Sequence, residues 1–416
     1  MTDSPGLQRR LGARDAVVLG LGAMVGAGVF SAFAPAADAA GSWLLVGLLL
    51  AAAVAYCNAT SSAQLAAQYP TSGGTYLYGR ERLGEWWGFL AGWAFVVGKT
   101  ASLAAMALTF AAYSVPDPWQ RPTAVAAVVL LAAVNYRGIT RTAQLTRVIV
   151  TVVLLALGTG VLVSLVAGSP ASSRLHLTSG VGVLGVLESA GLLFFAFAGY
   201  ARIATLAEEV RDPRRTIPRA ITVALLLTVC LYTVVGATVL AVLGPEGTAA
   251  SDAPLAAAVG STGWDWATPV VRVGAAAASL GALLALVAGV GRTALAMGRN
   301  GDLPSWLAEV HPRFHVPHHA EVAVAVAVCA LVLTVDLRGA IGFSSFGVLL
   351  YYFVANLAAL SQDPEHRRYP RGAQVAGAIG CLALALTLPA EAVLGGLLVL
   401  ALGASYRFWR QRSAGI

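Results

Sequence analysis

The sequence predicts an all-α integral membrane protein with about twelve transmembrane helices. Hydrophobic residues make up 58% of the 416 residues and charged residues only 11%, whereas soluble domains average roughly 45–50% and about 25%. Apolar stretches long enough to cross a bilayer recur along the whole chain. Arginines gather in alternate connecting segments. These observations exclude a soluble globular protein and indicate a single membrane domain, because no connecting segment is long enough to hold a second folded module.

Hydropathy separates the predicted helices from the polar segments between them. The expected limits are 15–38, 42–66, 85–113, 122–137, 143–167, 182–206, 218–243, 267–298, 320–336, 339–360, 373–389 and 391–406. The membrane domain therefore spans residues 15–406, between an N-terminal tail over 1–14 and a C-terminal tail over 407–416. The longest polar connections are expected at 67–84, 207–217 and 299–319.

The basic residues predict the orientation of these helices. The 27 basic residues are 26 arginines and a single lysine. If both termini are cytoplasmic, 21 arginines fall in inner segments and 4 in outer ones, and Arg202 lies within the sixth helix. This asymmetry follows the positive-inside rule. It predicts a multi-pass protein of the cell membrane with both termini in the cytoplasm, and it explains the net charge of +7 without a nucleic-acid partner.

Two predicted helices are interrupted near their middle. In the first, Gly22, Gly26 and Gly28 fall within seven residues, and in the sixth Gly199 stands among aromatic residues in the run Phe195–Tyr200. Glycine is a poor helix former, and exposed backbone at membrane depth is tolerated only where it is buried in protein or lines a cavity. The alternative for Gly22 and Gly26 is close helix packing, since they also form a GxxxG pair.

Interrupted helices at matching positions of two halves are the best sequence indication of a transporter's substrate site. A half-helix starting at Gly28 directs free backbone N–H groups and a positive dipole end into the site, where they suit a carboxylate. Unwound carbonyl groups suit an ammonium group. The pattern therefore indicates an amino acid as the ligand.

Four blocks of the sequence resemble the amino acid/polyamine/organocation superfamily of permeases. The blocks are Gly22 to Phe30, Tyr69 to Tyr76 with its P-x-x-G-G-x-Y pattern, Phe195 to Tyr200 followed by Glu208 to Pro213 and Ile217 to Ile221, and Arg292 to Pro304. They occur in the family's order and cover nearly the whole chain. The sequence departs from many members at Ala201, where they have a glutamate, and at Val153, where proton-coupled relatives have a lysine.

The resemblance implies a fold of two inverted five-helix repeats, about 15–167 and 182–360, with two further helices over 373–406. It implies a secondary active amino acid transporter that works by alternating access and is either proton-coupled or an exchanger. The alternatives are a carrier of polyamines or other organic amines, and a membrane sensor that transports nothing. The substrate-binding residues implied are Gly26, Ala27 and Gly28 for the carboxylate, with Val25 beside them, and Phe195, Ala198 and Gly199 near the amino group, with Tyr200 at the border.

Lys99 is the only lysine, and it lies at the midpoint of the third predicted helix. An ionisable residue at that depth costs at least about 2.5 kcal/mol on insertion scales and indicates a functional site. We hypothesise that Lys99 supplies the cation that sodium provides in sodium-coupled relatives, or carries a coupled proton. The structural alternative is an ammonium group held by Thr100, Ser102 and backbone carbonyls. In the tenth helix, Ser345, Tyr351 and Tyr352 are candidates for substrate selection.

Neither a metal nor a cofactor is expected. The four cysteines lie in apolar runs without metal-ligand or redox spacing. Four histidines lie between 311 and 319, but Pro312 and Pro317 interrupt that segment and so prevent a helical pair of metal ligands. A membrane-embedded enzyme is not expected either, because no histidine lies within a predicted helix and Lys99 has no carboxylate near it in sequence.

Overall fold

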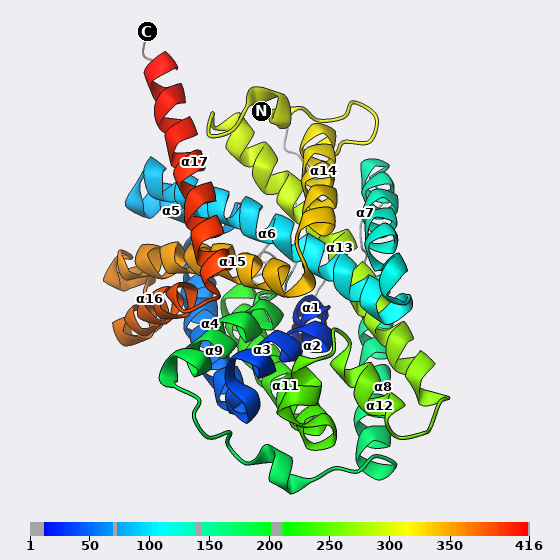
Figure 1. Cartoon of the computed structure of the whole chain (residues 1–416). Helices are drawn as coiled ribbons and strands as arrows, with labels where there is room; N and C mark the ends of the chain where they lie inside the picture. The colour runs from blue at the N-terminus through cyan, green and yellow to red at the C-terminus, as the bar shows by residue number, and fades with distance from the viewer. Residues whose placement is uncertain (1–11, 70–72, 139–142, 201–209, 211, 415–416) are drawn as a thin grey trace.

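The computed structural model describes residues 12–69, 73–138, 143–200, 210 and 212–414. The regular secondary structure of this part of the chain is helical (Figure 1), as predicted. The principal helices are α1 (Ala13–Met24), α2 (Gly28–Ser31), α3 (Phe33–Ala40), α4 (Leu44–Gln68), α5 (Gly74–Leu83), α6 (Glu85–Ser114), α7 (Gln120–Tyr136), α8 (Ala143–Val166), α9 (Val183–Phe197), α11 (Pro213–Ala249), α12 (Pro254–Gly260), α13 (Ala267–Arg299), α14 (His318–Thr334), α15 (Leu337–Leu360), α16 (Arg371–Leu386) and α17 (Ala390–Ala414).

Seven helical segments in the described residues are long and apolar enough to cross a membrane, and three shorter apolar helices accompany them. The shorter ones are Val183–Phe197, His318–Thr334 and Arg371–Leu386. The number of twelve membrane crossings stays a prediction, because length and composition do not by themselves place a helix across a bilayer.

The first predicted helix is divided into three pieces. Helix α1 ends at Met24, Val25 leaves the helical region with φ −75° and ψ 70°, and α2 starts at Gly28. The N–H of Gly26 donates to the Met24 carbonyl over 2.7 Å, which closes a tight turn instead of continuing the helix. The interruption therefore falls at Val25–Ala27, and the half-helix begins at Gly28, as the glycine spacing predicts.

The sixth predicted helix also stops at its aromatic run. Helix α9 ends at Phe197, and Ala198 to Tyr200 form a turn in which the Tyr200 N–H donates to the Phe197 carbonyl over 3.4 Å. Ala201, Arg202 and Glu208–Glu209, on which the sequence analysis also drew, lie outside the described residues.

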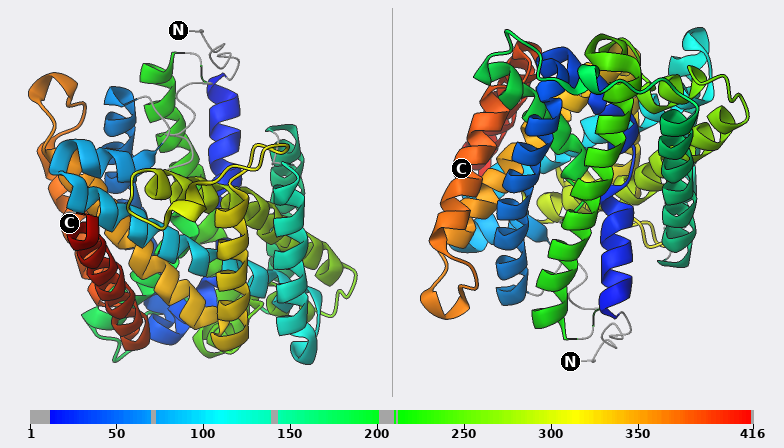
Figure 2. Two further views of the ribbon diagram at one scale, coloured as in Figure 1. Left: turned by 90° about the horizontal axis from the view of Figure 1, so that it is seen from above. Right: turned by 90° about the horizontal axis from the view of Figure 1, so that it is seen from below.

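The long helices pack around the two interrupted ones. Helix α6 packs along α13 and α15, and α9 packs against α3 and α4. Both views in Figure 2 show α1 beside α11, with which it is in contact. The middle of the bundle is filled by small and aromatic side chains such as Ala104, Phe30 and Tyr113, all fully buried.

Several elements differ from the sequence expectations. Helix α12 lies in a segment where no helix was expected, and α17 continues to Ala414, past the expected end at 406 and into the expected C-terminal tail. The connection expected at 67–84 contains the helix α5, whose glycine start Gly73–Gly74 has positive φ angles of 152° and 56°. Helix α11 begins at Pro213 instead of 218, because a proline suits the first turn of a helix, where its missing N–H is not needed. Its expected end at 243 coincides with a kink at Gly244, where φ is 73°.

Candidate substrate site

The two interrupted helices touch each other through their backbones. A Cβ atom added to Gly28 would lie 2.5 Å from the Cα of Ala196, and one added to Gly199 would collide with the Ala23 carbonyl. Both glycines are therefore required for the close approach of the two breaks. Both were predicted to bind the substrate, and the space that their side chains would fill is taken by the backbone of the opposite break.

The hydroxyl of Tyr232 on α11 bridges the two breaks. It lies 2.8 Å from the Met24 carbonyl oxygen at the end of α1 and 3.1 Å from the Ala196 carbonyl oxygen near the end of α9. Tyr232 is fully buried. Carbonyl groups at the end of a helix have no partner within the helix, and a buried carbonyl without a donor is costly. Tyr232 therefore stabilises both interruptions at once.

Lys99 reaches the second break from the middle of α6. Its ammonium group donates to the Ala198 carbonyl over 3.3 Å, and the hydroxyl of Tyr352 on α15 lies 3.5 Å from the same oxygen. The side chain is 8% exposed. Among the described residues, the ion pairs involve arginines and one histidine, and none involves Lys99. The buried amino group of Lys99 thus lies at the unwound backbone of the sixth helix.

The hydroxyl groups proposed as structural partners of Lys99 are used elsewhere. Thr100 donates to the Val96 carbonyl on its own helix over 2.7 Å, and Ser102 lies 2.6 Å from the hydroxyl of Ser344. Among the described residues, the hydrogen bond that Lys99 donates goes to the Ala198 carbonyl and to neither of these hydroxyls.

The remaining predicted site residues are brought together in the buried interior. Val25, Ala27, Phe195 and Ala198 are all less than 9% exposed, and the fully buried ring of Tyr200 stacks on Tyr352 with centroids 4.9 Å apart. A Cβ added to Gly26 would lie 3.3 Å from the Cβ of Ala282 on α13. The predicted substrate-binding backbone therefore faces α13 on one side and the sixth-helix break on the other.

Sequence reasoning missed two tyrosines that hold the first helix. They are Tyr232, described above, and Tyr113 on α6, whose hydroxyl donates to the Phe30 carbonyl over 2.8 Å while its ring packs edge-on against Phe30. A tyrosine deep within an apolar helix is the sequence signal that was available, because a buried hydroxyl needs a partner. Of the tenth-helix candidates, Tyr352 reaches the break, whereas the Tyr351 hydroxyl accepts a hydrogen bond from the N–H of Thr75.

A second polar cluster centres on Asp302, which follows α13. The carboxylate accepts hydrogen bonds from Tyr76 over 2.6 Å and from Arg80 over 3.0 Å, and it also pairs with Arg407 of α17. Arg407 lies 3.4 Å from the carboxylate of Glu85. Asp302 is 4% exposed. One buried carboxylate thus ties α5, the end of α13 and α17 together.

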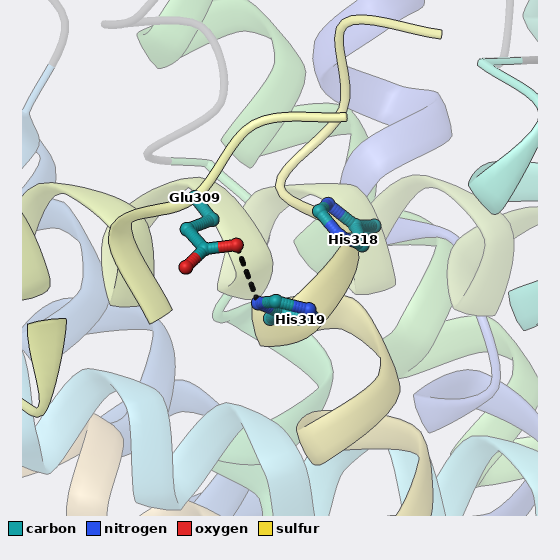
Figure 3. A group of neighbouring side chains, drawn as sticks. All are labelled: Glu309, His318 and His319. Atoms are coloured by element: carbon teal, nitrogen blue, oxygen red, sulfur yellow. Dashed lines mark ion pairs between the residues drawn. The ribbon is translucent and has the colours of Figure 1, made fainter. Parts of the chain in front are cut away.

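The histidine-rich segment gathers near a carboxylate (Figure 3). The Nδ1 atom of His319 lies 3.4 Å from Glu309 and 3.0 Å from the Trp306 carbonyl oxygen, and the ligand atoms of Glu309, His318 and His319 all lie within 4.8 Å of one another. His318 and His319 begin α14, and Glu309 is a neighbour that the sequence did not indicate. We interpret the group as an ion pair, because Nδ1 of His319 is already occupied.

Comparisons with known proteins show the family of the chain. Residues 11–402 match the family model described as amino acid permease. The chain is 58% identical over 397 residues to an uncharacterized transporter of Mycobacterium tuberculosis, which covers 95% of this chain and 90% of that protein.

Two more distant relatives have names that state a substrate. A branched-chain amino acid permease of Bacillus subtilis is 26% identical, with 89% of this chain and 84% of the relative covered. Cationic amino acid transporter 6 of Arabidopsis thaliana is 31% identical, with 84% of this chain and 65% of the relative covered. Because the permease model spans nearly the whole chain, the protein belongs to the amino acid permease family of the amino acid/polyamine/organocation superfamily, as a multi-pass membrane transporter and not an enzyme.

Proposed function

We propose that the protein is a secondary active transporter of neutral amino acids that works by alternating access around the two breaks. The observation that carries the proposal is the buried contact of the first-helix and sixth-helix backbones, with Tyr232 bridging them and Lys99 at the Ala198 carbonyl. Unwound backbone at this depth supplies donors and acceptors that no apolar side chain offers.

The substrate carboxylate is assigned to the first break. Unwinding over Val25–Ala27 leaves N–H groups at the start of α2 without a partner inside a helix. These groups and the backbone of Gly26, Ala27 and Gly28 bind the carboxylate, while Phe195, Ala198 and Gly199 lie near the amino group and Tyr200 borders the pocket.

The charge at the site favours a zwitterion over a cation. The buried ammonium group of Lys99 repels a cationic side chain, and opposite charges are needed to hold one at low dielectric. An apolar side chain fits the aromatic and small residues around Ala198. The branched-chain permease among the relatives is the nearer functional parallel, and a polyamine or other organic-amine carrier is the second candidate.

We assign to Lys99 the role of coupling substrate transport to a cation. It either replaces the sodium ion of sodium-coupled transporters as a fixed cation, or it gives up and regains a proton during each cycle. An exchange mechanism needs only the fixed charge. We place the protein in the cell membrane with both termini in the cytoplasm, on the basis of the arginine asymmetry.

The test is uptake into proteoliposomes of single amino acids and polyamines, with an inward proton gradient, with sodium, or with unlabelled substrate inside. Uptake of neutral amino acids supports the proposal. Flux of none of these compounds, with binding retained, would favour a sensor instead.

Lys99→Arg and Lys99→Met separate the two roles of the lysine. Arginine keeps a charge and cannot be deprotonated in a protein. A fixed cation predicts that Lys99→Arg works and Lys99→Met fails, whereas a proton carrier predicts that both lose proton-driven uptake. Normal transport and pH response in Lys99→Met would remove Lys99 from the mechanism.

A further inference from the structure

Helices α4, α15 and α16 pack against one another (Figure 1). A line of polar side chains, here called the polar seam, lies between them. Its members are Asn58, Ser61, Ser62, Gln64 and Gln68 from α4, Tyr352, Asn356 and Gln362 from α15 and the residues after it, and Gln374 and Cys381 from α16. Nearly all are buried. The transport function proposed above assigns no role to the seam residues between Tyr352 and the end of α4 that we propose to be cytoplasmic.

The seam begins at the substrate site. The Tyr352 hydroxyl shares the Ala198 carbonyl with Lys99. One helical turn further along α15, the Asn356 amide donates to the Tyr352 carbonyl over 2.9 Å and to the Asn58 side-chain oxygen over 2.6 Å. The Tyr200 hydroxyl, which interacts with the side chains of both Tyr352 and Asn58, joins these contacts near Lys99 to the seam.

The seam continues to the end of α4 that we propose to be cytoplasmic. Ser61 donates to the Asn356 side-chain oxygen over 2.7 Å, Gln374 reaches Gln64 over 3.4 Å, and Gln362 donates to Gln68 over 2.5 Å. From Asn58 to Gln68 the rise along α4 is about 15 Å. That distance is about half of a hydrocarbon core of roughly 30 Å, so the seam joins mid-membrane to one face.

Several polar atoms along the seam lack a partner among the described residues. They are Ser62 Oγ, Gln362 Oε1 and Gln374 Oε1. Hydrogen bonds between helices explain the polar groups that have a partner, but not those that lack one. A buried polar atom without a partner costs about 1–3 kcal/mol, and bound water is the usual way in which such groups are satisfied.

From this alignment we propose that the polar seam is a water-filled route along which protons pass between Lys99 and the cytoplasmic face. The inference rests on the proposed transport function and specifies how its coupling site reaches water. The ammonium group of Lys99 transfers one proton to water in the seam and is left as a neutral amine, and the proton leaves past Gln64, Gln68 and Gln362. The amine takes up a proton from the opposite side when the site faces outward. Asn and Gln side chains orient the water without storing charge.

Cys381 allows the hydration of the seam to be tested without transport. Its thiol is fully buried and donates to the Asn58 side-chain oxygen over 3.3 Å. A protein in which Cys381 is the sole cysteine is treated with silver ions from the cytoplasmic side, using inside-out membrane vesicles. The protein is then denatured and treated with a maleimide. A thiol that has reacted with silver is protected from this labelling. A sole-Cys329 protein, with its thiol on the apolar helix α14, is the matched control.

The proton route is tested with Asn356→Leu, which replaces the central amide by an apolar side chain of similar size. Asn135→Leu is the control, because Asn135 is a buried amide on α7 that donates to the Leu284 carbonyl outside the seam. Uptake driven by a proton gradient and exchange of labelled for unlabelled substrate are measured for both variants.

We expect silver to react with Cys381 and not with Cys329, and Asn356→Leu to lose proton-driven uptake while it keeps exchange. The proposal would be overturned if silver protected neither cysteine from maleimide labelling, or if Asn356→Leu kept proton-driven uptake. Wild-type amino acid uptake that an inward proton gradient does not increase would also overturn it, while leaving the transport function intact. Absence of any amino acid flux would instead refute the proposed function itself.

Discussion

Gly28→Ala tests whether the contact of the two breaks builds the site. Gly28 lies in a helical conformation at the start of α2, so alanine causes no strain in φ. The added Cβ, however, would lie 2.5 Å from the Cα of Ala196 and 2.7 Å from its Cβ. The obstruction is backbone of α9, which no side-chain rotation can remove.

The magnitude follows from the required displacement. Ordinary contact begins near 3.4 Å, so the two segments must separate by about 0.9 Å. A substrate hydrogen bond of about 2.9 Å would lengthen to roughly 3.8 Å, beyond the useful range. Losing one such bond to a charged carboxylate costs about 1.5–3 kcal/mol, which is roughly a 10- to 150-fold weaker apparent affinity. Overpacking adds about 1–3 kcal/mol of destabilisation.

The assay combines thermal unfolding in detergent with the concentration dependence of amino acid uptake. Gly158→Ala on α8 is the matched control, because nothing lies within 4 Å of the Cβ it would add. Gly158→Ala should leave the stability unchanged or raise it slightly, since alanine is a better helix former than glycine. If Gly28→Ala had the stability and apparent affinity of Gly158→Ala, the two breaks would not depend on their close contact, and the reasoning would fail.

Three further substitutions address other contacts. Tyr232→Phe removes the donor shared by two buried carbonyls; we expect a loss of about 1–3 kcal/mol in stability and lower uptake, and unchanged values of both would contradict the bridge. Asp302→Asn leaves the buried Arg407 with the exposed Glu85 as its remaining carboxylate partner and should cost about 3 kcal/mol. Thermal unfolding measures this loss against the exposed-pair control Asp363→Asn, which should cost about 1 kcal/mol or less; equal melting temperatures would refute it. Asp336→Ala removes the side chain that caps α15 and should lower stability by about 1 kcal/mol without changing substrate selection, which an uptake panel checks.

The sequence alone determined the class of the protein and the position of its first break. Long apolar runs force helices, because a bilayer offers backbone groups no water. Glycine clustering located the turn at Val25–Ala27 and the start of α2, since helix propensity is a local property. The midpoint of one apolar run likewise identified Lys99 as a residue that requires a partner.

Only the tertiary structure decided which groups meet. Lys99 reaches Ala198 across 99 residues of sequence, Tyr232 reaches Met24 across 208, and Asn356 reaches Asn58 across 298. Such contacts depend on the rotation and depth of whole helices, which packing between neighbours sets and which leave no periodic pattern in the chain. Hydropathy therefore gives the helices and their breaks, whereas the partners of buried polar groups follow from how the helices are packed.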